Sequence, residues 1–178
     1  MIYRNQQQRV AVLVDVQNLY YSAKGVYKAH VSYKNLLSLC IQNRVLTRAI
    51  AYVIRTPQRT EDTFLEAINS AGFEVKEKDL QVFADGAMKG DWDLGIAMDA
   101  IRLGHKVDSI ILCSGDGDYV PVVNYLQQSL GCLVEVVAFG KTANKQLKEI
   151  ADDFINLDEQ ANSILFRPRR NKVKRAAQ

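Results

Sequence analysis

Short apolar segments rich in β-branched residues recur along the chain, separated by stretches of mixed polarity. They are RVAVLVD (9–15), RAIAYVI (48–54), DSIILC (108–113), LVEVVAF (133–139) and FINL (154–157). Because these segments are apolar on both faces of an extended chain, they predict the strands of a parallel sheet covered by helices on both sides. The segment FEVKEKDLQVF (73–83) is more polar, which predicts a strand near an edge of the sheet.

Amphipathic stretches lie between these strands and predict helices near 32–46, 58–71, 92–104, 119–130 and 142–151. Boundary residues support several of these helices. Ser32 and Asp91 are predicted N-caps, and Gly72, Gly104 and Gly131 are placed just past C-terminal ends. The alternation of strand and helix predicts a single α/β domain, built on a doubly wound, mostly parallel sheet flanked by helices. We assign this domain to residues 1–160 and a tail to residues 161–178.

The formal net charge of +3 is unevenly distributed. Residues 167–178 carry six Lys/Arg and no acid, which leaves a net charge of −3 for residues 1–166. Such a basic end is typical of a disordered tail, and a polyanion is the partner that it favours through counterion release. An end of this composition can also serve only to keep a protein in solution.

The overall composition excludes several classes of protein. A length of 178 residues with 48% hydrophobic residues suits one globular core, which excludes a disulfide mini-protein and a two-domain enzyme. Cys40, Cys113 and Cys132 form no C-x-x-C pair, so we expect neither a disulfide framework nor a structural zinc site. No apolar run approaches the roughly 18 residues of a membrane span, and the opening segment is polar. We therefore expect a soluble cytoplasmic protein.

Acidic residues gather at the carboxyl ends of the predicted strands. Asp15 ends the strand 9–15, Asp116 and Asp118 follow the strand 108–113, and Asp93 opens the helix that leads into that strand. Ligands of such sheets bind at this edge, where the strand order reverses. If the two strands are neighbours there, the four carboxylates converge, and they cannot all stay ionised unaided.

A hard divalent cation would resolve this repulsion. Oxygen ligands without a His/Cys set suit Mg²⁺ or Mn²⁺, held by a few carboxylates and several waters. Such a cation polarises a phosphoryl oxygen and activates water. The pattern therefore predicts hydrolysis of phosphodiester bonds.

Local structure offers another explanation for several of these residues. Asp15 can stabilise the start of a following helix, Asp93 can be an acid favoured by the helix dipole, and Asp118 can cap the helix near 119. The sequence suggests no capping role for Asp116. Asn18 is either a turn residue or an amide that orients a metal-bound water.

Three segments, in this order, resemble a known family: VLVDVQNLYY (12–21), KGDWDLGIAMDA (89–100) and SGDGDYVPVV (114–123). They are similar to the NYN-domain proteins of the LabA-like group, within the PIN-like nuclease superfamily. The resemblance implies a Rossmann-like PIN fold and a ribonuclease site that depends on Mg²⁺ or Mn²⁺. It also implies RNA as the partner and leaves a homodimer open, while the lack of a long apolar run argues against membrane association.

The resemblance places four carboxylates on the family's acidic positions, where they would bind metal and act in catalysis: Asp15, Asp93, Asp116 and Asp118. Asn18 matches the family's asparagine and is expected to position water or substrate. Asp99 also matches, as a residue that either supports the site or faces solvent. Substrate contacts are expected from Lys89, Asn18 and Ser114.

One departure from the PIN pattern keeps a second function class open. PIN domains usually carry a further acid on the helix after the first strand, whereas no acid occurs here between Asp15 and Glu61. The family also includes regulators, so a non-catalytic nucleic-acid-binding or regulatory module that retains the pocket is the alternative. A metal-dependent phosphatase of the haloacid-dehalogenase type is a third interpretation, although its first-strand motif has an aspartate where Gln17 stands.

Overall fold

A parallel sheet forms the centre of the computed structural model, which describes residues 4–55, 62–82 and 88–167, with the backbone alone for residues 62, 81, 82, 88 and 89. The sheet strands are β1 (Arg9–Asp15), β3 (Val45–Arg55), β4 (Glu74–Asp79), β7 (Ser109–Cys113), β8 (Leu133–Ala138) and β9 (Asp153–Asn156). Their order is β4-β3-β1-β7-β8-β9, and every neighbouring pair is parallel. The strand order reverses between β1 and β7, as in Rossmann-like folds. The predicted doubly wound α/β fold is confirmed.

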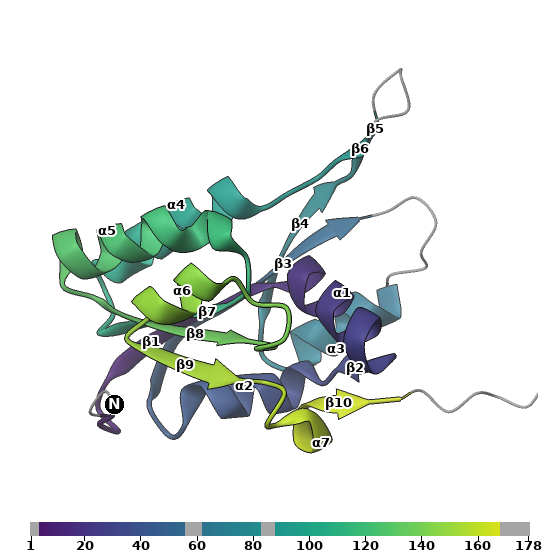
Figure 1. Cartoon of the computed structure of the whole chain (residues 1–178), viewed down its shortest axis with the longest axis horizontal. Helices are drawn as coiled ribbons and strands as arrows, with labels where there is room; N and C mark the ends of the chain where they lie inside the picture. The colour runs from purple at the N-terminus through teal and green to yellow at the C-terminus, as the bar shows by residue number, and fades with distance from the viewer. Residues whose placement is uncertain (1–3, 56–61, 83–87, 168–178) are drawn as a thin grey trace, which may run out of the picture.

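Helices and short strands fill the connections. The helices are α1 (Val16–Tyr27), α2 (Tyr33–Ile41), α3 (Asp62–Ser70), α4 (Asp93–Gly104), α5 (Val120–Leu130), α6 (Lys145–Ile150) and α7 (Ala161–Ile164), with a 3₁₀ turn, η1, at Gly117–Tyr119. Outside the main sheet, β2 (His30–Val31) pairs with β10 (Leu165–Phe166), and β5 (Gln81–Val82) pairs with β6 (Met88–Lys89). Figure 1 shows the β5–β6 pair extending away from the main sheet.

The central strand β1 is buried on both faces because successive side chains point to opposite sides of a strand. Val10, Val12 and Val14 pack into a core shared with α1, α2 and α3. Ala11 and Leu13 pack into a second core shared with α4, α5 and α6. The two helical layers can be followed in Figure 1. This double burial explains why the segment 9–15 is apolar throughout.

The helix boundaries confirm some sequence predictions and correct others. Ser32 caps α2, with its hydroxyl accepting from the Asn35 backbone, and Gly131 ends α5 at a positive φ of 63°. Asp91 is not an N-cap, since the N-cap residue of α4 is Trp92, without a side-chain hydrogen bond. Gly104 is the last residue of α4 and not the first one beyond it, and glycine suits this position because a Cβ there would stand 2.7 Å from the Leu126 side chain.

Two further differences concern element lengths. The helix α1 was not predicted, although it follows β1 directly. The helix predicted over 32–46 ends at Ile41, because Gln42 and Asn43 adopt positive φ angles and β3 begins at Val45. The polar segment 73–83 supplies β4 at one edge of the sheet, as predicted.

The segment assigned to the tail is partly folded. Residues 161–166 form α7 and β10, and Ile164 is buried in the core on the α1–α3 side. The expectation of disorder for this part of the tail is therefore wrong, because its apolar side chains find a place beside β2. Residues 168–178, with most of the basic charges, lie outside the described residues.

The cysteines are all buried and free. Burial raises the pKa of the Cys113 thiol well above its ordinary value, and its Sγ lies 3.6 Å from that of Cys40. Cys113 is thus a core residue, as expected for the end of a buried strand. Among the described residues, none of the helices is both long and apolar enough to cross a membrane.

Candidate active site

An acidic pocket of about 290 Å³ opens at the carboxyl ends of β1 and β7. Its wall includes Asp15 and Asn18 from the β1–α1 junction, Asp93 at the start of α4, and Asp116 from the loop after β7. The sequence predicted that the carboxylates of Asp15, Asp93, Asp116 and Asp118 converge here; the structure brings the first three together with Asn18, whereas Asp118 does not line the pocket. Asp91 and Trp92 complete the wall beside Asp93, with Gln17, Tyr21, Ser22 and Ile54 around them.

Asp15 is the last residue of β1 and also the N-cap of α1. Its Oδ1 accepts a hydrogen bond of 3.0 Å from the Asn18 backbone nitrogen, and its Oδ2 faces the hydroxyls of Tyr119 at 3.3 Å and Ser114 at 3.5 Å. Only 9% of the residue is exposed. Burial raises the pKa of Asp15 and the charge of Asp93 raises it further, against the opposing effect of the Asn18 hydrogen bond. Among the residues that the structure describes, no cationic side chain is paired with this buried carboxylate.

Tyr119 joins the two deepest acids of the pocket. Its hydroxyl lies 3.0 Å from Asp93 Oδ1 in addition to its contact with Asp15. Burial raises the pKa of Tyr119, and the two carboxylates raise it further, so the phenol keeps its proton. A phenol has one proton to donate, so it serves one carboxylate at a time. The repulsion between the two acids is therefore only partly relieved.

Asp93 is half-buried at the first position of α4. Burial raises the pKa of this carboxyl, and the charges of Asp116, Asp91 and Asp118 raise it further, although the Tyr119 hydrogen bond opposes them. Sequence reasoning missed Tyr119. The available signal was its position, three residues after Asp116 at the same edge of the sheet.

The loop after β7 is held by backbone and side-chain hydrogen bonds. The Gly115 nitrogen donates to Asn18 Oδ1 at 2.9 Å, and the Asp116 nitrogen donates to Ser114 Oγ at 3.2 Å. Asp116 also has a capping role that the sequence did not reveal, because its Oδ1 accepts from the Asp118 nitrogen at the start of η1. Gly115 leaves room for the neighbouring loop, since a Cβ there would lie 2.9 Å from Ala143 Cα.

Two other predicted residues, Ser114 and Asp118, stand apart from the pocket wall. Ser114 is completely buried, so it has no surface with which to contact a substrate and instead supports Asp15 and Asp116. Asp118 is exposed and does not line the pocket. The predicted substrate contact of Lys89 lies outside the described part of the structure, which gives the backbone of this residue in β6 but not its side chain.

Asp99 is neither solvent-facing nor part of the acidic pocket. It is 8% exposed and accepts hydrogen bonds from Tyr52 and Arg102, each at 2.7 Å, and from Lys76. Burial alone would raise the pKa of Asp99, but these partners prevail and lower it. Its charge is therefore compensated, in contrast to that of Asp15.

The donor set of the acidic pocket consists of oxygen atoms. Within residues 4–55, 62–82 and 88–167, no group of three or more His, Cys, Asp or Glu side chains is arranged to hold a metal ion. Asp15 and Asp93 are nevertheless linked through one hydroxyl, with Asp116 in the same wall. Two carboxylates with room for water suit a hydrated hard cation such as Mg²⁺, which is commonly bound by one or two carboxylates.

Comparison with known proteins agrees with this geometry. The NYN domain family model matches residues 9–158. The chain is 24% identical over 160 residues to the low amplitude and bright protein LabA of Synechococcus elongatus, covering 85% of this chain and 84% of that protein. A crystal structure of a Vibrio parahaemolyticus protein of unknown function is 33% identical and superimposes with a TM-score of 0.83, covering 93% of this chain and all of that one. The chain therefore belongs to the NYN domain family, a PIN-like nuclease family whose membership supports a nuclease role on nucleic acid.

Proposed function

We propose that this protein is a ribonuclease that depends on Mg²⁺ or Mn²⁺ and hydrolyses RNA phosphodiester bonds at the acidic pocket. The observation that carries the proposal is the meeting of Asp15 and Asp93 at the single hydroxyl of Tyr119. The two carboxylates come from distant parts of the chain, and burial together with neighbouring acidic charges raises the pKa values of both. A bound cation would offset this repulsion.

The proposed metal ligands are Asp15, Asp93 and Asp116, directly or through water. Asp118 is exposed and outside the wall, so we assign it a contribution through its charge or through a water. When bound, the cation polarises a phosphoryl oxygen and lowers the pKa of a bound water. Asp15, Asp93 and Asp116 would hold the cation, and their remaining oxygens would accept hydrogen bonds from water beside it.

Asn18 is the proposed contact to water or substrate. Its Oδ1 is used by the Gly115 nitrogen, which leaves the amide N–H groups as the donors for a phosphate oxygen. Tyr119 is a positioning residue in this proposal, because its hydroxyl holds the two carboxylates at one point. Ser114 supports the same arrangement from beneath, and Lys89 remains a proposed phosphate contact.

RNA is the proposed substrate, and the cytoplasm is the proposed location. The basic segment 167–178 favours a polyanion, while the pocket itself is acidic, which suits a metal-bridged phosphodiester better than a direct anion site. The buried cysteines are free thiols, which fits a reducing compartment.

The test is cleavage of an end-labelled single-stranded RNA with Mn²⁺, with Mg²⁺, and with EDTA. We expect cleavage only with metal, and a loss of at least about 100-fold for Asp15→Asn, since a charged ligand of the cation is removed. Glu149→Gln on α6 is the control, because this side chain is exposed and belongs to no wall of the acidic pocket. A phosphomonoester should not be hydrolysed.

Each contrary result identifies another class. Metal-independent RNA binding without cleavage would favour the regulatory module that retains the pocket. Hydrolysis of a phosphomonoester without RNA cleavage would favour a phosphatase. Equal cleavage by wild type and Asp15→Asn, free of contaminating nuclease, would remove the acidic pocket from the reaction.

A further inference from the structure

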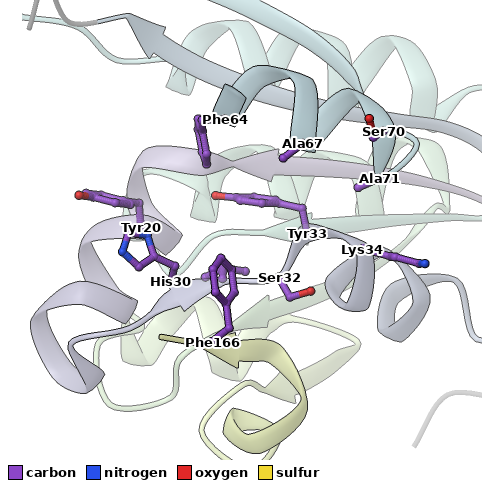
Figure 2. A pocket seen from close by; sticks show the side chains of 11 residues that line it. Tyr20, His30, Ser32, Tyr33, Lys34, Phe64, Ala67, Ser70, Ala71 and Phe166 are labelled. Atoms are coloured by element: carbon purple, nitrogen blue, oxygen red, sulfur yellow. The ribbon is translucent and has the colours of Figure 1, made fainter. Parts of the chain in front are cut away.

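A second cavity, of about 420 Å³, lies between α1, α2, α3 and β10. We call it the aromatic pocket, and its rings come from Tyr20, His30, Tyr33, Phe64 and Phe166. Figure 2 shows these rings arranged around the space, with Phe64 on α3 opposite Phe166 on β10. Its volume falls in the range of roughly 300–1,000 Å³ of pockets that hold small organic ligands.

The rings that line the pocket contact one another in two groups. His30 packs against Phe166 with ring centroids 5.8 Å apart and against Tyr20 at 6.1 Å, while Tyr33 packs against Phe64 at 5.8 Å. Phe166 is 51% exposed, so much of its apolar face remains available to a ligand. Planar aromatic ligands stack well on such faces.

The charges around the aromatic pocket favour an anionic ligand. None of the described lining residues is acidic, and Lys34 is part of the wall. Lys24 reaches the rim from α1, where its Nζ lies 3.2 Å from the Tyr20 hydroxyl and 5.3 Å from the centre of the ring. Arg167 is exposed and directly follows Phe166. Rings for stacking together with cations for phosphate are the features that bind single-stranded nucleic acid.

The aromatic pocket and the acidic pocket share α1. Asn18 and Tyr21 of this helix line the acidic pocket, whereas Tyr20 lines the aromatic pocket. The rings of Tyr20 and Tyr21 pack edge to face, with centroids 5.4 Å apart. The two pockets are therefore adjacent along α1, on either side of the Tyr20–Tyr21 ring contact.

We infer that the aromatic pocket binds an unstacked base of a single-stranded RNA whose backbone extends to the acidic pocket. The inference rests on the proposed ribonuclease function and specifies its substrate as single-stranded. The base inserts between the His30–Phe166 group and the Tyr33–Phe64 group. The adjacent phosphates are met by Lys24, Lys34 and Arg167.

The experiment compares two ligands of equal length and charge in EDTA, where no cleavage occurs: a labelled hexa-adenylate and an abasic sugar-phosphate hexamer. By fluorescence anisotropy, the wild type should bind the adenylate at least about fivefold more tightly, since stacking of one base gives a factor of roughly 5 to 150. Phe166→Ala and Tyr20→Ala should reduce the affinity for adenylate toward that for the abasic ligand. Tyr20→Phe keeps the aromatic ring, so this variant should retain the affinity for adenylate.

Tyr125→Ala is the matched control, because Tyr125 is a 44% exposed tyrosine on α5 that lines neither pocket. Equal binding of the two hexamers by the wild type, or unchanged adenylate affinity in a folded Phe166→Ala variant, would overturn the inference. Light scattering checks the oligomeric state of the same variant. A Phe166→Ala variant with an altered oligomeric state and an unchanged affinity for adenylate would also overturn the inference, and would assign the aromatic pocket to a protein interface.

Hydrolysis of bis(p-nitrophenyl) phosphate with Mn²⁺ separates this inference from the proposed function. This diester has no nucleobase. Base-dependent binding without diester or RNA hydrolysis would leave the aromatic pocket in place and reject the nuclease proposal. Hydrolysis of RNA together with equal affinity for both hexamers would support the nuclease proposal and reject base binding in the aromatic pocket.

Discussion

The side-chain oxygen of Asn18 accepts a hydrogen bond of 2.9 Å from the backbone nitrogen of Gly115. This bond connects the first turn of α1 with the loop after β7, across the point where the strand order reverses. It therefore holds together the two elements that carry Asp15 and Asp116. The asparagine thus has a structural role that is independent of any contact with substrate.

Removing this acceptor should destabilise the protein. We expect Asn18→Ala to lower the free energy of unfolding by about 1–2 kcal/mol, because the half-buried Gly115 N–H loses its partner. Urea denaturation in EDTA measures the change. Asn124→Ala, an asparagine of α5 outside the acidic pocket, is the control and should change the value by less than about 0.5 kcal/mol. Similar losses for both variants would show that the bond to Gly115 is not the cause.

The raised pKa values of Asp15 and Asp93 predict how stability depends on pH without metal. The unfolded chain releases these protons near pH 4, whereas the folded protein retains them to higher pH. In between, the folded state binds more protons, so this contribution to stability is lost as pH rises. Asp93→Asn removes one of these groups and one charge that acts on Asp15.

Melting temperatures between pH 4 and pH 8 in EDTA test this prediction. The wild type should lose stability relative to Asp93→Asn as pH rises, and saturating Mn²⁺ should stabilise the wild type more than the variant, which lacks one of the proposed ligands. The comparison with the variant matters because Asp99, Asp108 and Glu135 have lowered pKa values, whose effect on stability has the opposite sign. A constant difference across this pH range would contradict the prediction.

Asp116→Asn should separate charge from capping. Asparagine can still accept the hydrogen bond from the Asp118 nitrogen, so η1 should keep its cap, while the charge that raises the pKa of Asp93 is removed. We expect an unchanged or higher melting temperature in EDTA, loss of RNA cleavage, and a smaller thermal shift with Mn²⁺, since stabilisation by a ligand follows its affinity. A substantially lower melting temperature in EDTA would instead mark Asp116 as structural.

Truncation after Phe166 should affect binding more than chemistry. It removes six Lys/Arg, so RNA affinity should fall and the salt dependence should flatten by up to about six phosphate contacts, each with a log–log slope of roughly 0.7. The cleavage rate at saturating RNA should stay within about threefold, because the truncated chain keeps every residue named in the acidic pocket wall. Equal affinity and equal salt slope for both chains would place RNA binding entirely on the folded part.

The strand pattern predicted the fold and most of the acidic pocket for a simple reason. Parallel strands end at one edge, so Asp15 and Asp116 had to be close once β1 and β7 were neighbours. Asp93 followed from the direction of the helix that enters β7. These inferences needed only chain direction and hydrophobic pattern, which a single sequence contains.

The residues that were misjudged depend on tertiary contacts. Gly104 was placed just beyond the helix, but it is the last residue of α4, where the Leu126 side chain of α5 lies close to its Cα. Asp118 carries the same charge as Asp116, yet Asp118 is exposed in the η1 turn, whereas Asp116, the N-cap of that turn, lines the acidic pocket. Tyr119 gains its role only from the approach of Asp93 on another element. These features depend on contacts between different elements, which leave no periodic pattern in the sequence.

The edge strand β4 limits how the sheet can grow. Five of its six residues, EVKEKD, are charged. Two of them form ion pairs with the neighbouring strand β3, Glu74 with Arg48 and Glu77 with Arg55. Charged residues on an edge strand oppose pairing with a strand of another molecule, because the charges would have to be brought together and desolvated. Self-association by continuation of the sheet is therefore disfavoured at β4, and a dimer of this chain would have to form through another surface.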